Sequence, residues 1–171
     1  MVIKELAAGN GTIGVTTCPG ILATPGDTRS PADRLVADLQ NLLDWGTTAL
    51  VTLLEDVEFE ILNVQDLGST AMAVGMTWIH LPIADHTVPG EWFENLWPPY
   101  STVLCGMLAK GKKVTIHSRS GYERNGMVAA RLLIEAGLSA DEALARTRTL
   151  AADILLDEVR VNWVLKGQSH S

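Results

Sequence analysis

The chain has 171 residues, a length typical of one domain, and 47% of them are hydrophobic, which is enough to bury a sizeable core. Its formal net charge is −7, and acidic and basic residues are mixed along it, so it lacks the basic face that binding to nucleic acid requires. No apolar run approaches the roughly 18 residues of a membrane-spanning helix, so we expect no membrane partner.

The termini and the cysteines show little pattern. We expect a single domain over residues 1–171, with residues 1–11 and 166–171 as tails. The N-terminal region has no basic start followed by an apolar stretch, so no secretory signal is predicted. Cys18 and Cys105 form no disulfide framework, which is typical of two reduced thiols in a cytoplasmic protein.

Hydrophobic periodicity predicts strands and helices that alternate along the chain. Strands are expected at residues 48–54, 76–81 and 113–116, and residues 12–18 form either a strand or the ordered end of the N-terminal tail. Helices are expected at residues 31–45, 90–109, 125–136, 139–150 and 153–165, with an acidic, broken helix at residues 55–75. Pro98 and Pro99 interrupt the helix at 90–109, which predicts a kink or two helices there.

Capping residues mark the ends of two of these helices. Ser30 and Pro31 form a typical helix start, and Gly46 a typical end. Ser139 precedes another helix, with Glu142 at the capping-box position. The alternation predicts an α/β fold, a central, mostly parallel sheet of four to five strands flanked by helices, with its site at the carboxyl ends of the strands.

The segment after the strand at 113–116 has the character of an anion site. A loop follows the strand and a helix follows the loop, with Ser118 and Arg124 six positions apart and Gly121 between them. Backbone N–H groups of such a loop, the helix N-terminus and a planar guanidinium can together surround an anion. The spacing therefore predicts a phosphate-binding cup.

Two motifs resemble a known family. His117, Ser118, Gly121 and Arg124 resemble the signature loop of cysteine-dependent protein tyrosine and dual-specificity phosphatases, which reads His-Cys-five residues-Arg; Ser118 stands where the catalytic cysteine belongs. Residues 80–89 resemble the general-acid loop of the kinase-associated phosphatase branch, with Asp85 as the acid. The order of the elements matches as well, over roughly residues 15–165. The resemblance implies a protein tyrosine phosphatase-like fold.

The resemblance also implies roles for single residues. Ser118 occupies the nucleophile position, Asp85 is the general acid, and Arg124 clamps the transition state. His117 orders the loop, and Asn125 stands where the family places a hydroxyl that steadies the leaving sulfur. The phosphate-binding loop consists of Ser118, Arg119, Ser120, Gly121, Tyr122, Glu123 and Arg124. No cofactor or metal is implied, and the four histidines are not spaced as a metal site.

Ser118 conflicts with catalysis, because an alcohol stays protonated where a thiol would ionise. The chain is either an engineered Cys-to-Ser form that holds substrate without cleaving it, or a natural pseudophosphatase that binds phosphorylated partners. The match of Asp85, His117, Gly121 and Arg124 favours the engineered form, because a binding module has no use for a general acid. The loop is expected to hold phosphate or sulfate in either case.

The residues around the loop favour a phosphorylated protein or peptide as partner. Glu123 disfavours polyanions such as multiply phosphorylated inositol lipids, although a small phosphometabolite or phosphoinositide remains an alternative substrate. A set of acidic residues is expected to form a solvated face, and a set of aromatic residues to pack mostly in the core. They are Asp33, Glu55, Asp56, Glu58 and Glu60, and Trp92, Phe93, Trp97 and Tyr100.

Overall fold

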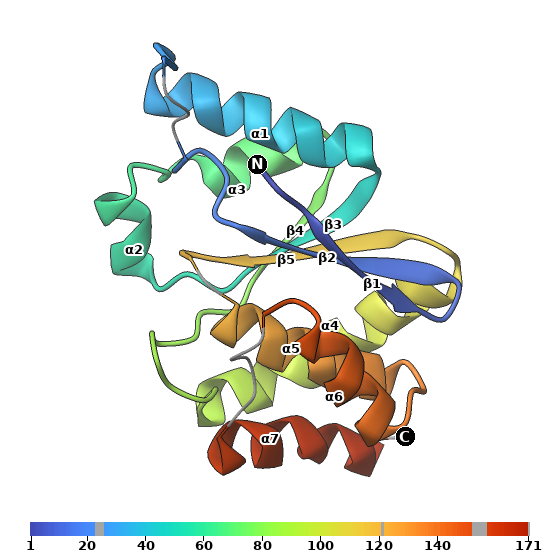
Figure 1. The fold of residues 1–171 in the computed structure, drawn as a ribbon. Coiled ribbons are helices and arrows are strands. Elements are labelled where there is room, and N and C mark those ends of the chain that lie inside the picture. Colours follow the sequence, from blue (N-terminus) through green and yellow to red (C-terminus); the bar gives the residue numbers. More distant parts are fainter. Residues whose placement is uncertain (23–25, 121, 152–156, 171) are drawn as a thin grey trace.

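A five-stranded sheet forms the centre of the computed structural model, which describes residues 1–22, 26–120, 122–151 and 157–170 (Figure 1). The strand order is β1-β2-β5-β3-β4, and β2, β5, β3 and β4 run parallel while β1 is antiparallel to β2. The bounds are β1 Lys4–Ala8, β2 Gly11–Thr17, β3 Thr47–Thr52, β4 Thr77–His80 and β5 Lys113–Ser118. The predicted α/β fold with a mostly parallel sheet is confirmed.

Helices cover both faces of this sheet (Figure 1). Along β3, Ala49 and Val51 join one buried cluster and Leu50 joins the other, as the alternation of side chains along a buried strand requires. The helices that pack on the Leu50 side are α1 Pro31–Trp45 and α3 Leu67–Ala73, with the short α2 Asp56–Ile61. Those on the other side are α4 Glu91–Ala109, α5 Glu123–Glu135, α6 Ala140–Arg148 and α7 Glu158–Leu165.

The two predicted tails are wrong where the structure describes them. Residues 4–8 form β1, which joins β2 through a two-residue turn at Gly9, whose φ of 60° suits the first position of such a turn. Leu6 and Ala8 alternate inward and are buried, so the strand is tied to the core. Residues 166–170 form a 3₁₀ helix, η1 Lys166–His170, which packs against α5. Residues 4–8 and 166–170 are therefore held by the fold.

The two prolines do not divide α4. The helix runs from Glu91 to Ala109 as one element, so of the two alternatives, a kink or two helices, the division into two helices is wrong. Pro98 and Pro99 each remove a backbone donor, but Trp97 before them and Leu104 after them are buried on the same face against the sheet. Packing of this face outweighs the local preference. Within the described ranges, none of the helices is both long and apolar enough to cross a bilayer.

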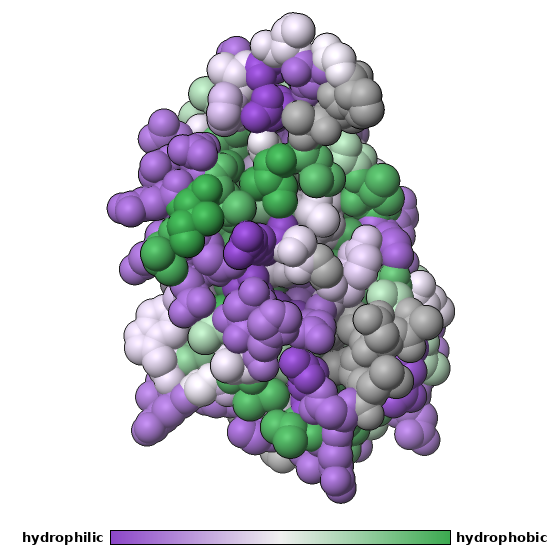
Figure 2. Space-filling model, turned by 60° about the vertical axis from the view of Figure 1, so that its left-hand side comes forward, coloured by the Kyte–Doolittle hydropathy of each residue, from purple (hydrophilic) through white to green (hydrophobic). Residues whose placement is uncertain are grey.

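Exposed hydrophobic side chains mark the surface at α2. Val57 and Ile61 lie four residues apart, on one side of the helix, and they are 57% and 59% exposed. Figure 2 shows hydrophobic residues gathered in a band at the height of α2, with hydrophilic residues above and below it. The surface beside α2 is therefore suited to an apolar contact.

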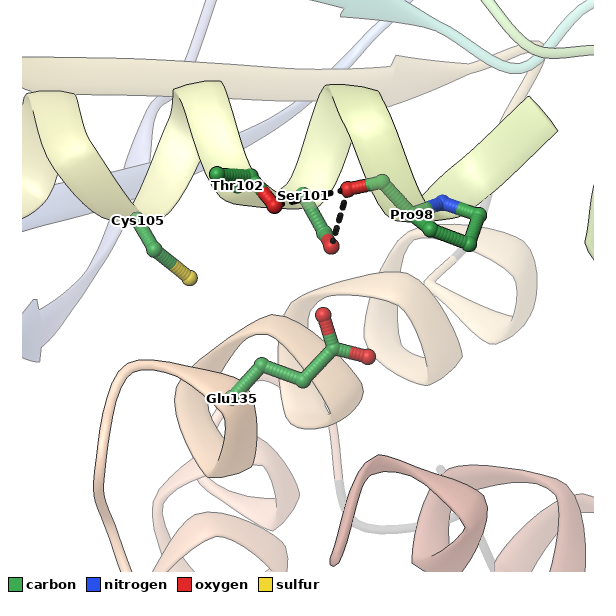
Figure 3. Close-up of a pocket in the computed structure, with 5 residues that line it drawn as sticks. All are labelled: Pro98, Ser101, Thr102, Cys105 and Glu135. Carbon is green, nitrogen blue, oxygen red and sulfur yellow. Dashed lines mark hydrogen bonds between the residues drawn. The ribbon is translucent and has the colours of Figure 1, made fainter. Parts of the chain in front are cut away.

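A pocket of about 290 Å³ lies between α4 and α5 (Figure 3). It is lined by Pro98, Ser101, Thr102, Cys105 and Glu135, and both hydroxyls donate to the Pro98 carbonyl. Burial and the charge of Glu135 raise the pKa of the Cys105 thiol to about 11. Glu135 ends α5, about 16 Å along the helix from its first turn. The pocket is therefore separate from the loop that precedes α5.

Candidate phosphate-binding site

The predicted loop begins at the carboxyl end of the central strand. β5 ends at Ser118, and its neighbours β2 and β3 end beside it, at Thr17 and Thr52. The Leu53 N–H donates to the His117 carbonyl at 3.0 Å, which continues the sheet toward the site. Because β4 runs parallel to β3, the acid loop leaves β4 at the same edge. The fold therefore brings the two motifs together, as the sequence predicts.

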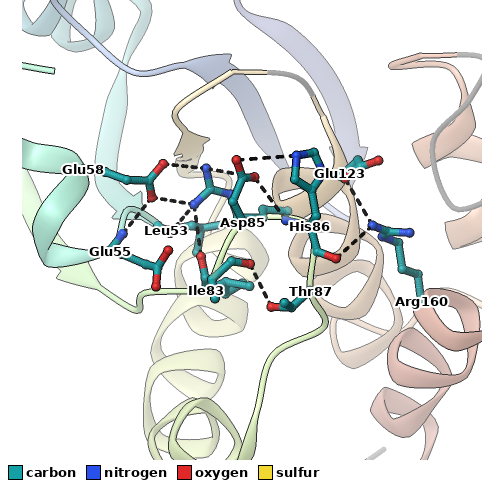
Figure 4. Close-up of polar contacts among 11 residues, drawn as sticks. Leu53, Glu55, Glu58, Ile83, Asp85, His86, Thr87, Glu123 and Arg160 are labelled. Atoms are coloured by element: carbon teal, nitrogen blue, oxygen red, sulfur yellow. Dashed lines mark hydrogen bonds and ion pairs between the residues drawn. The ribbon is translucent and has the colours of Figure 1, made fainter. Parts of the chain in front are cut away.

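Arg124 lies buried in the first turn of α5, with a 3% exposed side chain. Its Nη1 donates to Glu58 Oε2 at 2.7 Å and its Nη2 donates to Glu58 Oε1 at 2.9 Å, a bidentate pair (Figure 4). Nη1 also donates to the Ile83 carbonyl at 3.0 Å. Burial alone would lower the pKa of Arg124, but the hydrogen bonds and charge of Glu58, with the charge of Asp85, raise it above its ordinary value. The guanidinium is therefore a fixed cation.

Glu58 is the site residue that the sequence reasoning missed. We expected it on a solvated acidic face, but it is 5% exposed and faces inward. It lies in the first turn of α2, and its Oε2 also accepts from the Glu55 N–H at 2.9 Å, as in a capping box. The only signal in the sequence was the three-residue spacing of these two glutamates directly after a strand end.

Asp85 faces the guanidinium from the acid loop. Its Oδ1 lies 3.5 Å from Arg124 Nη2, although the two residues are 39 positions apart, and its side chain is 46% exposed. The same Oδ1 accepts from the backbone N–H of His86 at 3.2 Å. A carboxyl group that is half-exposed and lies next to the guanidinium is accessible to a bound ligand. The structure therefore brings two of the predicted catalytic residues together.

His117 and Ser118 lie buried at the end of β5, where the loop begins. Ser118 is 1% exposed, and its hydroxyl has no hydrogen-bond partner among the residues that the structure describes. His117 is fully buried, with its Nε2 2.8 Å from the Thr52 hydroxyl oxygen, which also accepts from Trp78 Nε1 at 2.9 Å. Burial lowers the pKa of His117 to about 3, so the imidazole stays neutral. It cannot act as a base toward the Ser118 hydroxyl.

The middle of the loop lies at the surface. Arg119 and Ser120 are exposed, and the Arg119 carbonyl accepts from the Cys18 N–H at 3.5 Å, which connects the loop to the end of β2. Tyr122 is half-buried, and its ring lies beneath Lys4, whose Nζ is 4.4 Å from the ring centroid. Gly121, a predicted loop residue, lies outside the described residues.

The two residues that flank Arg124 point in different directions. Asn125 is buried and its Nδ2 donates to the Thr16 carbonyl at 3.0 Å, so one amide hydrogen joins α5 to β2. Glu123 is 49% exposed, and its Oε2 lies 3.2 Å from Arg160 Nη2 and 3.3 Å from His86 Nδ1. The negative charge of Glu123 is therefore partly offset by Arg160, and its half-exposed side chain points outward.

The arrangement leaves one edge of the guanidinium for a ligand. Glu58 takes the edge formed by Nη1 and Nη2, and Arg124 Nε has no hydrogen-bond partner among the described residues. A tetrahedral oxyanion can take the edge formed by Nε and Nη2, where it would share Nη2 with Asp85. Within the described ranges, no three His, Cys, Asp or Glu side chains gather in a way that would hold a metal ion.

Comparisons with known proteins identify the fold. No protein-family model matches the sequence, and no curated protein sequence is significantly similar to it. A structure of kinase associated phosphatase (KAP), with its catalytic site cysteine substituted by serine, is 21% identical with a TM-score of 0.80, and covers 99% of this chain and 94% of that chain. A putative protein tyrosine phosphatase from Leishmania major is 16% identical with a TM-score of 0.68, covering 97% and 98%.

A third protein adds a ligand complex. PTPMT1 is 18% identical with a TM-score of 0.69, covering 97% of this chain and 94% of that chain. A structure of PTPMT1 in complex with PI(5)P is 21% identical over 76% of this chain and 81% of that chain, with a TM-score of 0.60. At these identities the likeness concerns the architecture. The chain has the α/β fold of its structural neighbours, which are protein tyrosine and dual-specificity phosphatases.

Proposed function

We propose that the loop from Ser118 to Arg124 binds the phosphate of a phosphorylated protein or peptide, and that the chain is an inactive form of a tyrosine or dual-specificity phosphoprotein phosphatase. The observation that carries this proposal is the 3.5 Å approach of Asp85 to Arg124 at the edge of the sheet where β5 ends at Ser118, whose buried hydroxyl has no partner among the described residues. Proton donor, phosphate clamp and nucleophile position are the three parts that monoester hydrolysis needs.

A cysteine at position 118 would complete this chemistry. Its thiolate, stabilised by the loop N–H groups and Arg124, would attack phosphorus in line and form a cysteinyl phosphate. Asp85 would give its proton to the departing oxygen, and would then take a proton from the water that hydrolyses the intermediate. The products are the free alcohol or phenol and inorganic phosphate.

Serine at this position stops the first step. The Ser118 hydroxyl would need a base, and its buried neighbour His117 has a pKa of about 3. Such a base is far too weak to take a proton from an alcohol. We therefore expect this chain to bind phosphate monoesters and to turn them over very slowly. The same expectation holds for an engineered Cys-to-Ser form and for a natural pseudophosphatase.

Two observations favour a protein substrate over a polyanionic lipid or metabolite. Glu58 and Asp85 place two carboxylates against one buried guanidinium, which disfavours ligands with several phosphates. The exposed aliphatic side chains Val57 and Ile61 flank Glu58 on α2 and offer an apolar contact to residues next to a phosphorylated side chain. Both features support a single phosphate carried on a polypeptide.

The reversion Ser118→Cys tests the enzymatic part of the proposal. The variant is expected to hydrolyse a small aryl phosphate, and Asp85→Asn in the same background should slow it by about 10²–10⁴-fold. A folded Ser118→Cys chain that binds phosphate without hydrolysing it would instead identify a pseudophosphatase. A substrate panel on an active variant separates phosphopeptides from phosphoinositides and small phosphometabolites. The codon for residue 118 in the natural gene decides whether serine is engineered.

A further inference from the structure

One carboxylate joins three separate parts of the chain at the rim of the site. Glu123, the first residue of α5, lies 3.3 Å through Oε2 from Nδ1 of His86 in the acid loop and 3.2 Å from Nη2 of Arg160 in α7 (Figure 4). Arg160 is itself held by Asp157, the N-cap of α7, whose Oδ1 accepts from the Arg160 N–H at 2.8 Å. The Asp157 and Arg160 side chains also form an ion pair.

The acid loop is held at the residue that follows the proposed acid. His86 has a φ of 58°, a conformation that a non-glycine residue rarely adopts unless its surroundings hold it there. Its backbone N–H donates to Asp85 Oδ1 at 3.2 Å, and its carbonyl accepts from Arg160 Nη2 at 3.5 Å. Its ring also faces the second Asp85 oxygen, at 3.7 Å. The position of Asp85 therefore depends on where His86 is held.

We propose that Glu123 is a positioning residue that, with Arg160 behind it, fastens the acid loop through His86 and so keeps Asp85 on the guanidinium of Arg124. The role of Asp85 as acid rests on the proposed function, whereas the fastening itself does not. This positioning role explains why a loop that binds a dianion carries a negatively charged residue at position 123.

The exposure of the partners sets the strength of this fastening. The side chains of His86, Glu123 and Arg160 are 80%, 49% and 20% exposed, so each pair is the weak, screened kind that shifts an equilibrium by up to about fivefold. Such contacts favour a closed loop without preventing it from opening to admit a ligand. Raised ionic strength should loosen the loop in the same way as removal of one partner.

Hydrogen–deuterium exchange on the unaltered Ser118 chain tests the fastening directly. The reporting amides are those of His86 and Thr87, since Thr87 N–H donates to the Ala84 carbonyl at 3.2 Å within the loop. Glu123→Gln and Arg160→Gln should each raise exchange at these amides by up to about fivefold, and the double variant should raise it further than Glu123→Gln alone, because Arg160 Nη2 also donates directly to the His86 carbonyl. Unchanged exchange in the single variants would overturn the proposal.

The control removes an exposed ion pair elsewhere. Glu142 pairs with Arg146 on α6 at 2.5 Å, with side chains 50% and 36% exposed. Glu142→Gln should leave exchange at His86 and Thr87 unchanged. An equal rise in this variant would mean that loss of any surface pair loosens the loop, and would contradict a specific role for Glu123.

A kinetic readout in the Ser118→Cys background tests the positioning of Asp85. If Glu123→Gln misplaces the acid, kcat should fall more for phenyl phosphate than for p-nitrophenyl phosphate, whose leaving group needs less protonation, while KM changes little. Equal losses for the two substrates would refute the positioning role. A Ser118→Cys chain with no activity would count against the proposed function alone, because the exchange experiment requires no turnover.

Discussion

Replacement of Glu58 by glutamine tests the ion pair that organises the site. Glu58 is 5% exposed and pairs bidentately with Arg124 at 2.7 and 2.9 Å. Removal of one partner of a buried pair typically costs about 3–5 kcal/mol, because the other charge stays buried without compensation. Glutamine keeps the shape and one acceptor oxygen, and Ile83 still accepts from Arg124, so we expect about 3 kcal/mol, the lower end of that range.

Urea unfolding followed by tryptophan fluorescence measures this loss. For a chain of this length, about 3 kcal/mol corresponds to a fall in Tm of about 6–12 °C. Glu60→Gln is the matched control, because Glu60 lies exposed on the same helix, and it should change the free energy of unfolding by less than about 0.5 kcal/mol. Equal stability of the two variants would refute the structural role of the pair.

Added phosphate extends the same experiment to the proposed ligand. In Glu58→Gln the guanidinium of Arg124 has lost its strongest counter-charge, so an anion bound there replaces a missing interaction. Inorganic phosphate should therefore raise the free energy of unfolding of Glu58→Gln more than that of the unaltered chain. Sodium chloride at the same ionic strength controls for screening. If phosphate stabilises neither protein, the anion is not binding at Arg124.

Three further predictions concern other groups of the chain. The pKa of His117 is about 3 in the folded chain, against an ordinary value of 6.5, so the unfolded chain binds a proton first as the pH falls below 6.5 and the folded state is destabilised. In urea titrations between pH 7 and 5, the free energy of unfolding of the unaltered chain should therefore fall by about 2 kcal/mol more than that of His117→Gln. In Ser118→Cys, iodoacetate at pH 7 should alkylate the new thiol faster than the Cys105 thiol, whose pKa is about 11, and inorganic phosphate should protect the new thiol. Equal alkylation rates of the two thiols, measured by mass spectrometry, would contradict an activated thiol at position 118. Gly68→Ala should cost about 1–3 kcal/mol in unfolding free energy, because its Cβ would lie 2.6 Å from the Trp78 ring; an unchanged urea midpoint would disprove this.

The sequence predicted that the two motifs would come together because few arrangements of a parallel sheet keep them apart. A parallel sheet places its carboxyl strand ends at one edge, so the loop after β5 and the loop after β4 had to meet there. The approach of Asp85 to Arg124 follows from this topology. The helix from Pro31 to Trp45 was also predicted with its exact bounds, because a capping serine, a proline and a glycine mark its ends.

The sequence could not show that Glu58 belongs to the site. It lies among other acidic residues, and a glutamate in such a run is usually solvated. What buries it is the placement of α2 beside the first turn of α5, a contact between residues 66 positions apart. Local pattern carries no information on that contact, and the same holds for the pair of Glu123 with Arg160.

The N-terminal strand was missed for a different reason. Residues 4–8 are a short run at the chain end with one strong apolar residue, Leu6, so their alternation is faint. The pairing with β2 makes the strand stable, since isolated short strands are not. The turn glycine, Gly9, was the signal that should have predicted a hairpin.

The central claim is that this loop binds one phosphate group. Titration calorimetry of phosphopeptides with the unaltered chain tests this claim most directly. Peptides that carry phosphotyrosine or phosphothreonine should bind, and their unphosphorylated counterparts should not. Arg124→Lys keeps the charge beside Glu58 but loses the planar fork, so it should weaken binding by at least about tenfold. Equal binding of phosphorylated and unphosphorylated peptides, or full affinity in Arg124→Lys, would contradict the account.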